Sequence, residues 1–289
     1  MPPPPHLFDL VIACDWSAAK GRKPEPGEDR CWLAWRTRET LNPDPEYMPT
    51  RLEAEARIRE LLDQHRSART LVGFDFAIGY PLAENGQPVL PIGRDLCALY
   101  AQRITDDPSG VNNRYEVAQD LNAKIRETTG APHGPFWGRP KEMKHLTGLP
   151  MGREKPTGVP QFRAAEDAAR GGGGGRPQSP WKLAGIGSVG SQSLMGLPTV
   201  HRLLTDPAFA PRTHLWPFEP APEHPSAITI AEIYPSLFPQ NAPKHWYKDA
   251  RQVVDSRNAL AEMASLEQPA HERAATEGWI LGVDGGVPG

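Results

Sequence analysis

Leu10-Val-Ile-Ala-Cys-Asp15-Trp-Ser-Ala-Ala-Lys-Gly21 is the stretch around which the chain is organised. Its apolar run ends on Asp15, and a second apolar run, Cys31–Trp35, follows a polar turn. This pattern predicts a buried strand, a turn and an antiparallel partner strand. A carboxylate at the end of a buried strand loses hydration and needs a compensating partner. A metal ion would compensate Asp15, and so would a cap of the turn made through Ser17.

The composition is that of a globular protein with room for a substantial core. The chain has 289 residues, of which 38% are hydrophobic and 23% charged. The net charge of -3 gives no global basic field, so a nucleic acid would have to bind at a local patch. Three scattered cysteines favour a reducing compartment over a disulfide framework. With no secretory signal and no apolar stretch of membrane-spanning length, we expect a cytoplasmic protein without membrane contact.

The sequence predicts an α/β frame interrupted by a long insertion. Residues 1–81 and 226–289 carry the frame, and residues 82–225 form a helical and irregular insertion with a Gly-rich loop at 171–175. Alternation and periodicity predict strands at 8–15, 31–37, 47–50, 70–75 and 227–232 and helices at 51–67, 94–103, 114–128, 164–170, 194–204 and 248–266. Short elements are expected at 181–185 and 277–283.

Three acids share one context, in which an apolar strand is followed by the acid and then a turn. They are Asp15, Asp75 and Glu232, and a fourth acid, Asp255, lies on the last predicted helix. Because the ends of parallel strands line a common crevice, these oxygens can converge on Mg²⁺ or Mn²⁺. The alternative is that each acid only caps its own turn. Asp249, with Gln252 three residues on, is interpreted as a helix capping box and hence as structural.

Two lysines and a serine near these acids are candidates for binding a phosphate. Lys20 and Ser17 follow Asp15, and Lys248 begins the last predicted helix; solvated loop and helix surface are the alternatives. Residues 131–160 combine lysine and arginine with Phe136 and Trp137, which suits either a stacking nucleic-acid surface or a basic lid. Residues 187–193 precede a helix and could cradle a phosphate, although a tight turn explains them equally.

Several motifs together resemble a family of predicted ribonuclease H-like nucleases. They are Ile-Ala-Cys-Asp15-Trp-Ser, Val-Gly-Phe-Asp75-Phe-Ala-Ile-Gly-Tyr-Pro, Ala-Glu232-Ile-Tyr-Pro, Asp255-Ser-Arg-Asn-Ala-Leu and the closing Glu-Gly-Trp-Ile-Leu-Gly. The likeness covers roughly residues 8–85 and 226–284. It implies a ribonuclease H-like mixed sheet with flanking helices, and metal-dependent phosphodiester hydrolysis. The chain departs from the family at Asn258, where a second aspartate is often found.

The sequence therefore predicts a metal-dependent nuclease or phosphoesterase. Asp15, Asp75, Glu232 and Asp255 would hold Mg²⁺ or Mn²⁺, and the substrate would be a nucleic acid or a small phosphoester. An ATP-dependent phosphotransferase of the actin and sugar-kinase type is one alternative, because Asp15-Trp-Ser-Ala-Ala-Lys20 loosely fits its opening motif. A non-catalytic binding module on the same fold is the other.

Overall fold

A mixed six-stranded sheet forms the centre of the protein in the computed structural model, which describes residues 6–40, 43–109, 111–171 and 175–283. The strand order is β3-β2-β1-β4-β6-β5. The strands are β1 (Leu10–Asp15), β2 (Cys31–Thr37), β3 (Glu46–Met48), β4 (Thr70–Phe74), β5 (Thr213–Leu215) and β6 (Ile228–Glu232). The first three pair antiparallel, whereas β4, β6 and β5 continue from β1 in parallel.

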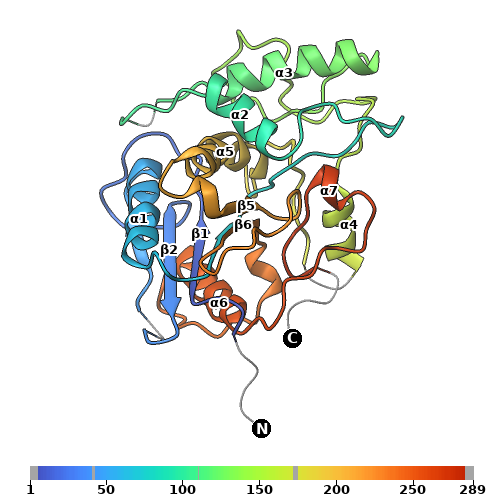
Figure 1. Cartoon of the computed structure of the whole chain (residues 1–289). Helices are drawn as coiled ribbons and strands as arrows, with labels where there is room; N and C mark the ends of the chain where they lie inside the picture. Colours follow the sequence, from blue (N-terminus) through green and yellow to red (C-terminus); the bar gives the residue numbers. More distant parts are fainter. Residues whose placement is uncertain (1–5, 41–42, 110, 172–174, 284–289) are drawn as a thin grey trace.

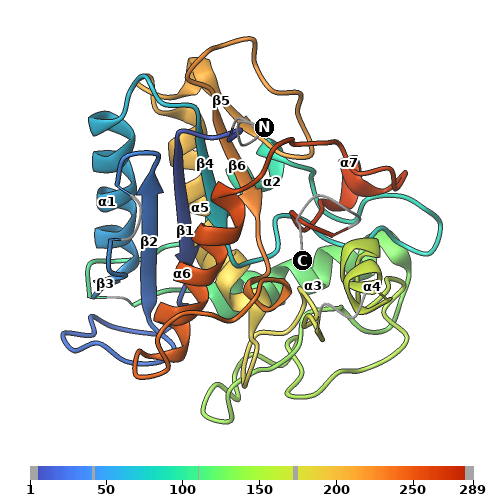
Figure 2. The same cartoon turned by 90° about the horizontal axis from the view of Figure 1, so that it is seen from below.

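Helices cover both faces of the sheet (Figures 1 and 2). One face carries α1 (Arg51–Gln64) and α5 (Val189–Thr205), whose apolar side chains share a core with Leu10 and Ile12. The other face carries α6 (Lys248–Ala261), which packs with Val11 and Ala13. The remaining helices are α2 (Arg94–Arg103), α3 (Arg114–Thr129), α4 (Ala164–Gly171), α7 (Ala274–Glu277) and the short 3-10 turns η1 (Ala210–Arg212) and η2 (Pro235–Leu237).

The strand register decides which face each acid can reach. Cys14, Phe74 and Glu232 lie opposite one another across β1, β4 and β6, so their side chains share one face. Asp15 is one residue beyond Cys14, and successive side chains on a strand alternate between faces. The side chain of Asp15 therefore leaves the sheet on the α6 side, opposite to that of Glu232.

The α/β architecture and most predicted elements are confirmed. The bounds of β2 and α2 are those expected, and α1, α3, α4, β4 and β6 differ from prediction by a few residues at most. The helix predicted to begin at residue 194 begins at Val189, so residues 189–193 belong to its first turn. Strand β5 was not predicted. Residues 181–185 form only an isolated bridge, between Lys182 and Trp137.

Parts of the 82–225 segment are built into the frame. Helix α5 supplies Leu194, Leu197 and Val200 to the main core, and β5 extends the sheet beside β6. The predicted Gly-rich loop lies largely outside the described residues, at 172–174. Among the helices that the structure describes, none has the length and apolar character needed to cross a membrane.

Candidate functional site

Asp15 and Asp75 meet at the carboxyl ends of the two central parallel strands. Asp15 ends β1, and Asp75 follows β4 directly, with its backbone N–H donating to the carbonyl of Cys14 at 3.2 Å. Asp75 Oδ1 accepts the N–H of Trp16 at 2.7 Å, and the charge of Asp75 acts on the neighbouring carboxyl group of Asp15. The sheet thus brings together two acids that are 60 positions apart, as the sequence predicted.

The surroundings of this pair favour its protonated state. Asp15 is only 9% exposed, and Asp75 is partly exposed but has protein around its carboxyl group. Burial, with the neighbouring charge of Asp75, raises the pKa of Asp15 well above its ordinary value. Burial also raises the pKa of Asp75 to about 7, although the Trp16 N–H opposes this. Two carboxyl groups in contact hold a proton where solvated ones would be ionised.

Asp249 adds a third negative group, from the first turn of α6. It is buried, its Oδ2 accepts the N–H of Asp29 at 2.7 Å, and its charge raises the pKa of both Asp15 and Asp75. The predicted capping box is wrong, because α6 begins at Lys248 and its N-cap, Tyr247, makes no side-chain cap. Asp249 instead ties α6 to the β1–β2 turn beside the acid pair.

The N-terminus of α5 completes the surroundings of the pair. Gln192, in the first turn of α5, donates from Nε2 to the carbonyl of Trp16 at 2.8 Å and to Asp75 Oδ2 at 3.2 Å. Residues 187–193, interpreted as a turn or a phosphate cradle, therefore contribute a side chain that orients Asp75. No sequence pattern marked Gln192 itself.

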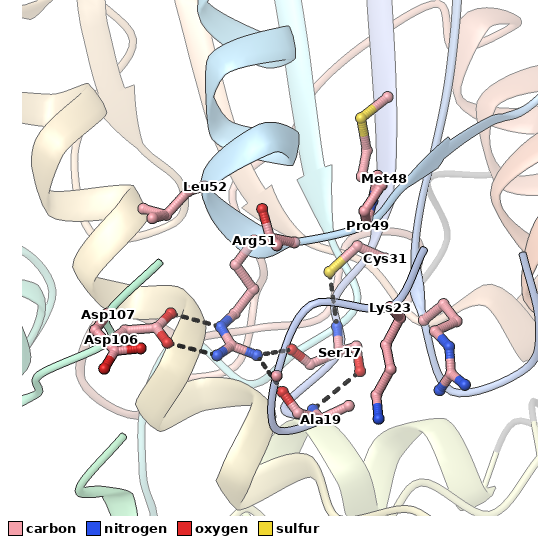
Figure 3. Close-up of a pocket in the computed structure, with 13 residues that line it drawn as sticks. Ser17, Ala19, Lys23, Cys31, Met48, Pro49, Arg51, Leu52, Asp106 and Asp107 are labelled. Carbon is pink, nitrogen blue, oxygen red and sulfur yellow. Dashed lines mark hydrogen bonds and ion pairs between the residues drawn. The ribbon is translucent and has the colours of Figure 1, made fainter. Parts of the chain in front are cut away.

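The turn after Asp15 is held by a buried arginine (Figure 3). Arg51 donates to the carbonyls of Ser17 and Ala19, both at 2.9 Å, and makes a two-bonded ion pair with Asp106 at 2.6 and 2.7 Å. The pocket that these residues line measures about 20 Å³, which is room for one water molecule. Arg51 therefore fixes the turn, and the pocket beside it is too small for a large ligand.

Glu232 does not join the acid pair. It is engaged by Arg163, whose Nη1 and Nη2 donate to its two oxygens at 2.8 and 2.5 Å, and its Oε2 also accepts the N–H of Ile78 at 2.9 Å. The same guanidinium binds Glu166, and Arg163 is fully buried. This network ties β6 to α4 and consumes the lone pairs that a metal ion would need.

Asp255 is likewise committed to main-chain partners. Its Oδ1 accepts the N–H groups of Asn241 and Ala242 at 3.1 and 2.8 Å, and Asn258 Oδ1 accepts from the neighbouring Arg257 at 3.0 and 3.1 Å. Asp255 lies six residues beyond Asp249, about 9 Å further along the helix axis. The structure thus brings together two of the four predicted acids and places a different acid of α6, Asp249, beside them.

The predicted phosphate-binding residues have different surroundings. Ser17 caps the turn, since its hydroxyl donates to the carbonyl of Asp29 at 2.8 Å and accepts the N–H of Ala19 at 3.0 Å. Lys20 is exposed, and Lys248 is exposed beside Asp249, where its charge opposes the rise in pKa of that acid. The idea that Phe136 stacks on a nucleic acid is wrong, because its ring is buried against Tyr80 and Trp181.

Neither geometry nor similarity assigns the site a ligand directly. Within residues 6–40, 43–109, 111–171 and 175–283, no group of three or more His, Cys, Asp or Glu side chains is arranged to hold a metal ion. The donors at the acid pair are nevertheless carboxylate oxygens, which suit a hard divalent cation. Compared with protein-family models, curated proteins and solved structures, the chain gives no match.

Proposed function

We propose that the protein is a metal-dependent phosphodiesterase with a ribonuclease H-like core. The observation that carries the proposal is the adjacency of Asp15 and Asp75 at the ends of neighbouring parallel strands. The sheet order supports the fold, because three antiparallel strands followed by a parallel β4 and β6 are what the family resemblance implies. Since many folds host unrelated chemistry, the argument for function depends on the site.

The acid pair fits a cation such as Mg²⁺ or Mn²⁺. Mg²⁺ keeps several waters and is often bound by one or two protein carboxylates together with substrate phosphates. Two acids that hold a proton at neutral pH carry an electrostatic cost when both ionise, and a divalent cation removes that cost. Glu232 and Asp255 are left out of this ligand set because Glu232 is paired with Arg163 on the other face of the sheet and Asp255 lies about two turns further along α6.

Each residue around the pair has a defined part in the proposed reaction. Asp15 and Asp75 bind the cation, which when bound supplies an activated water and charge stabilisation for the phosphate. Gln192 and the Trp16 N–H fix the orientation of the Asp75 carboxylate. Asp249 increases the negative potential at the pair, and Lys248 beside it offers a cation to a substrate phosphate.

A cleavage assay tests this proposal. End-labelled DNA and RNA, single- and double-stranded, would be incubated with the protein and Mg²⁺ or Mn²⁺. We expect metal-dependent cleavage by the wild type and by Asp63→Asn, which removes an exposed carboxylate on α1. Asp15→Asn should lose at least about a hundredfold of the rate, because it removes a cation ligand.

The same protein preparation distinguishes the two alternative functions, a phosphotransferase and a binding module. Transfer from labelled ATP without cleavage of any polymer would replace the proposal with a phosphotransferase. If the wild type shows neither activity and its melting temperature matches that of Asp63→Asn, a non-catalytic binding module would be favoured. Cleavage that survives in Asp15→Asn would show that the activity arises elsewhere or from a contaminant.

A further inference from the structure

A second hollow in the structure is lined by arginines and lies within the 82–225 segment. It measures about 500 Å³, within the size range of ligand pockets. Arg126 comes from α3, and Arg139 and Arg153 come from the irregular segment at 131–160. Backbone from Gly148 to Gly152 forms part of its wall.

The positive charge in this hollow is not neutralised by the residues that line it. Glu154 is the acid among them, and it pairs with His133 at 2.9 Å. Among the residues that the structure describes, Arg153 hydrogen-bonds to the side-chain oxygen of Gln161 and to no carboxylate, and desolvation lowers its pKa. Arg139 donates from Nε to the carbonyl of Leu149 at 2.9 Å, while its buried Nη1 has no hydrogen-bond partner in the part of the chain that the structure describes.

This arrangement of arginines favours the binding of a phosphate group. Guanidinium groups bind phosphate oxygens through paired, charge-assisted hydrogen bonds. A hollow with three arginines in a chain of net charge -3 creates a local positive potential where the whole molecule has none.

Helix α3 connects this hollow to the acid pair. Its first residue, Arg114, donates from Nε to Ser191 Oγ at 3.0 Å, and Ser191 adjoins Gln192, which contacts Asp75. Arg126 lies twelve residues further along α3, which corresponds to about 18 Å of helix. That length exceeds a single nucleotide, so one strand that reached both places would extend over several nucleotides.

We propose that the arginine hollow binds backbone phosphates of a nucleic-acid strand, several nucleotides from the phosphate at the acid pair. This inference rests on the proposed function and names its substrate class, a polynucleotide. The hollow recognises no base, because guanidinium–phosphate contacts carry no sequence information. Its function is to hold the strand while another part of it reaches Asp15 and Asp75.

Binding without cleavage tests the hollow separately from the catalytic site. The anisotropy of a labelled twelve-nucleotide single strand would be followed with the full chain in EDTA. Arg126→Gln and Arg153→Gln should each weaken binding roughly tenfold. Each should also reduce the slope of log K against log salt by about 0.7. The matched controls are Lys124→Gln on α3 and Lys244→Gln outside the 131–160 segment, exposed cations that do not line the hollow.

The outcomes separate a polynucleotide from a small anion. Equal loss of affinity in the arginine and lysine variants, or no binding by the wild type, would overturn the proposal. Thermal stabilisation by inorganic phosphate that depends on Arg126, without an effect of Arg126→Gln on the oligonucleotide, would assign the hollow to a small anion and also overturn it. Because no metal is present, failure of the cleavage assay leaves this result unaffected, and the melting temperatures of the variants verify folding.

Discussion

Asp75→Asn should flatten the pH dependence of the protein's stability. In the folded state burial raises the pKa of Asp75 to about 7, against an ordinary value of 3.8 in an unfolded chain. Between these values the folded state binds more protons than the unfolded state, so the free energy of unfolding falls as pH rises. The aspartate pair therefore makes the wild type less stable at pH 8 than at pH 5.

The size of the effect follows from these two pKa values. A group that titrates at about 7 when folded and 3.8 when unfolded loses roughly 2–3 kcal/mol of stabilisation between pH 5 and pH 8. Because Asp75 is partly exposed, solvent screening reduces this, and we expect about 1–2 kcal/mol. Asp75→Asn removes the titration of Asp75 and leaves that of the buried Asp15, so the pH dependence is reduced and not abolished. Any constant cost of losing the Gln192 contact cancels in the comparison of two pH values.

Chemical denaturation in EDTA at pH 5 and pH 8 measures the difference. The exposed-site variant Asp63→Asn controls for the general loss of a carboxylate. We expect the wild type and Asp63→Asn to lose stability relative to Asp75→Asn as pH rises. An identical pH dependence in all three proteins, or a relative gain by the wild type at pH 8, would refute the account of a buried pair that holds a proton.

Three further predictions concern the acids and their partners. Mg²⁺ at a hundred times its Kd should stabilise the wild type at pH 8 by about 2.7 kcal/mol in a denaturant titration and leave Asp75→Asn unchanged. Arg163→Met should cost about 3–5 kcal/mol, because it leaves Glu232 and Glu166 buried without a counter-ion; a loss below 1 kcal/mol would contradict this. Asp255→Ala should cost about 1–3 kcal/mol in the same measurement yet keep the Mg²⁺ stabilisation.

The sequence predicted the half of the site that depends on strands. Asp15 and Asp75 each follow a recognisable apolar run, and the parallel pairing of β1 with β4 brings them into contact. Glu232 has the same local pattern, but alternation along β6 turns its side chain to the other face. Its partner, Arg163, is 69 positions away in an irregular segment, so no local pattern reveals the ion pair.

Residues that reach the site from helices were harder to predict. Asp249 was interpreted as a cap because a helix start is a local feature, whereas its contact with Asp29 spans 220 positions. Gln192 was missed because the helix was expected to begin five residues later, at 194. In both cases the packing of a helix against the sheet, which depends on the whole core, decides the side chain's surroundings.

Calorimetric titration of the full chain with Mn²⁺ at pH 6, below the raised pKa of Asp75, tests the central claim most directly. The account predicts saturable binding by the wild type with release of a proton, because the cation replaces the proton held by Asp15 and Asp75. Binding should be lost in Asp15→Ala and retained in Asp255→Ala. No binding at millimolar Mn²⁺, or equal binding by the wild type and Asp15→Ala, would contradict it.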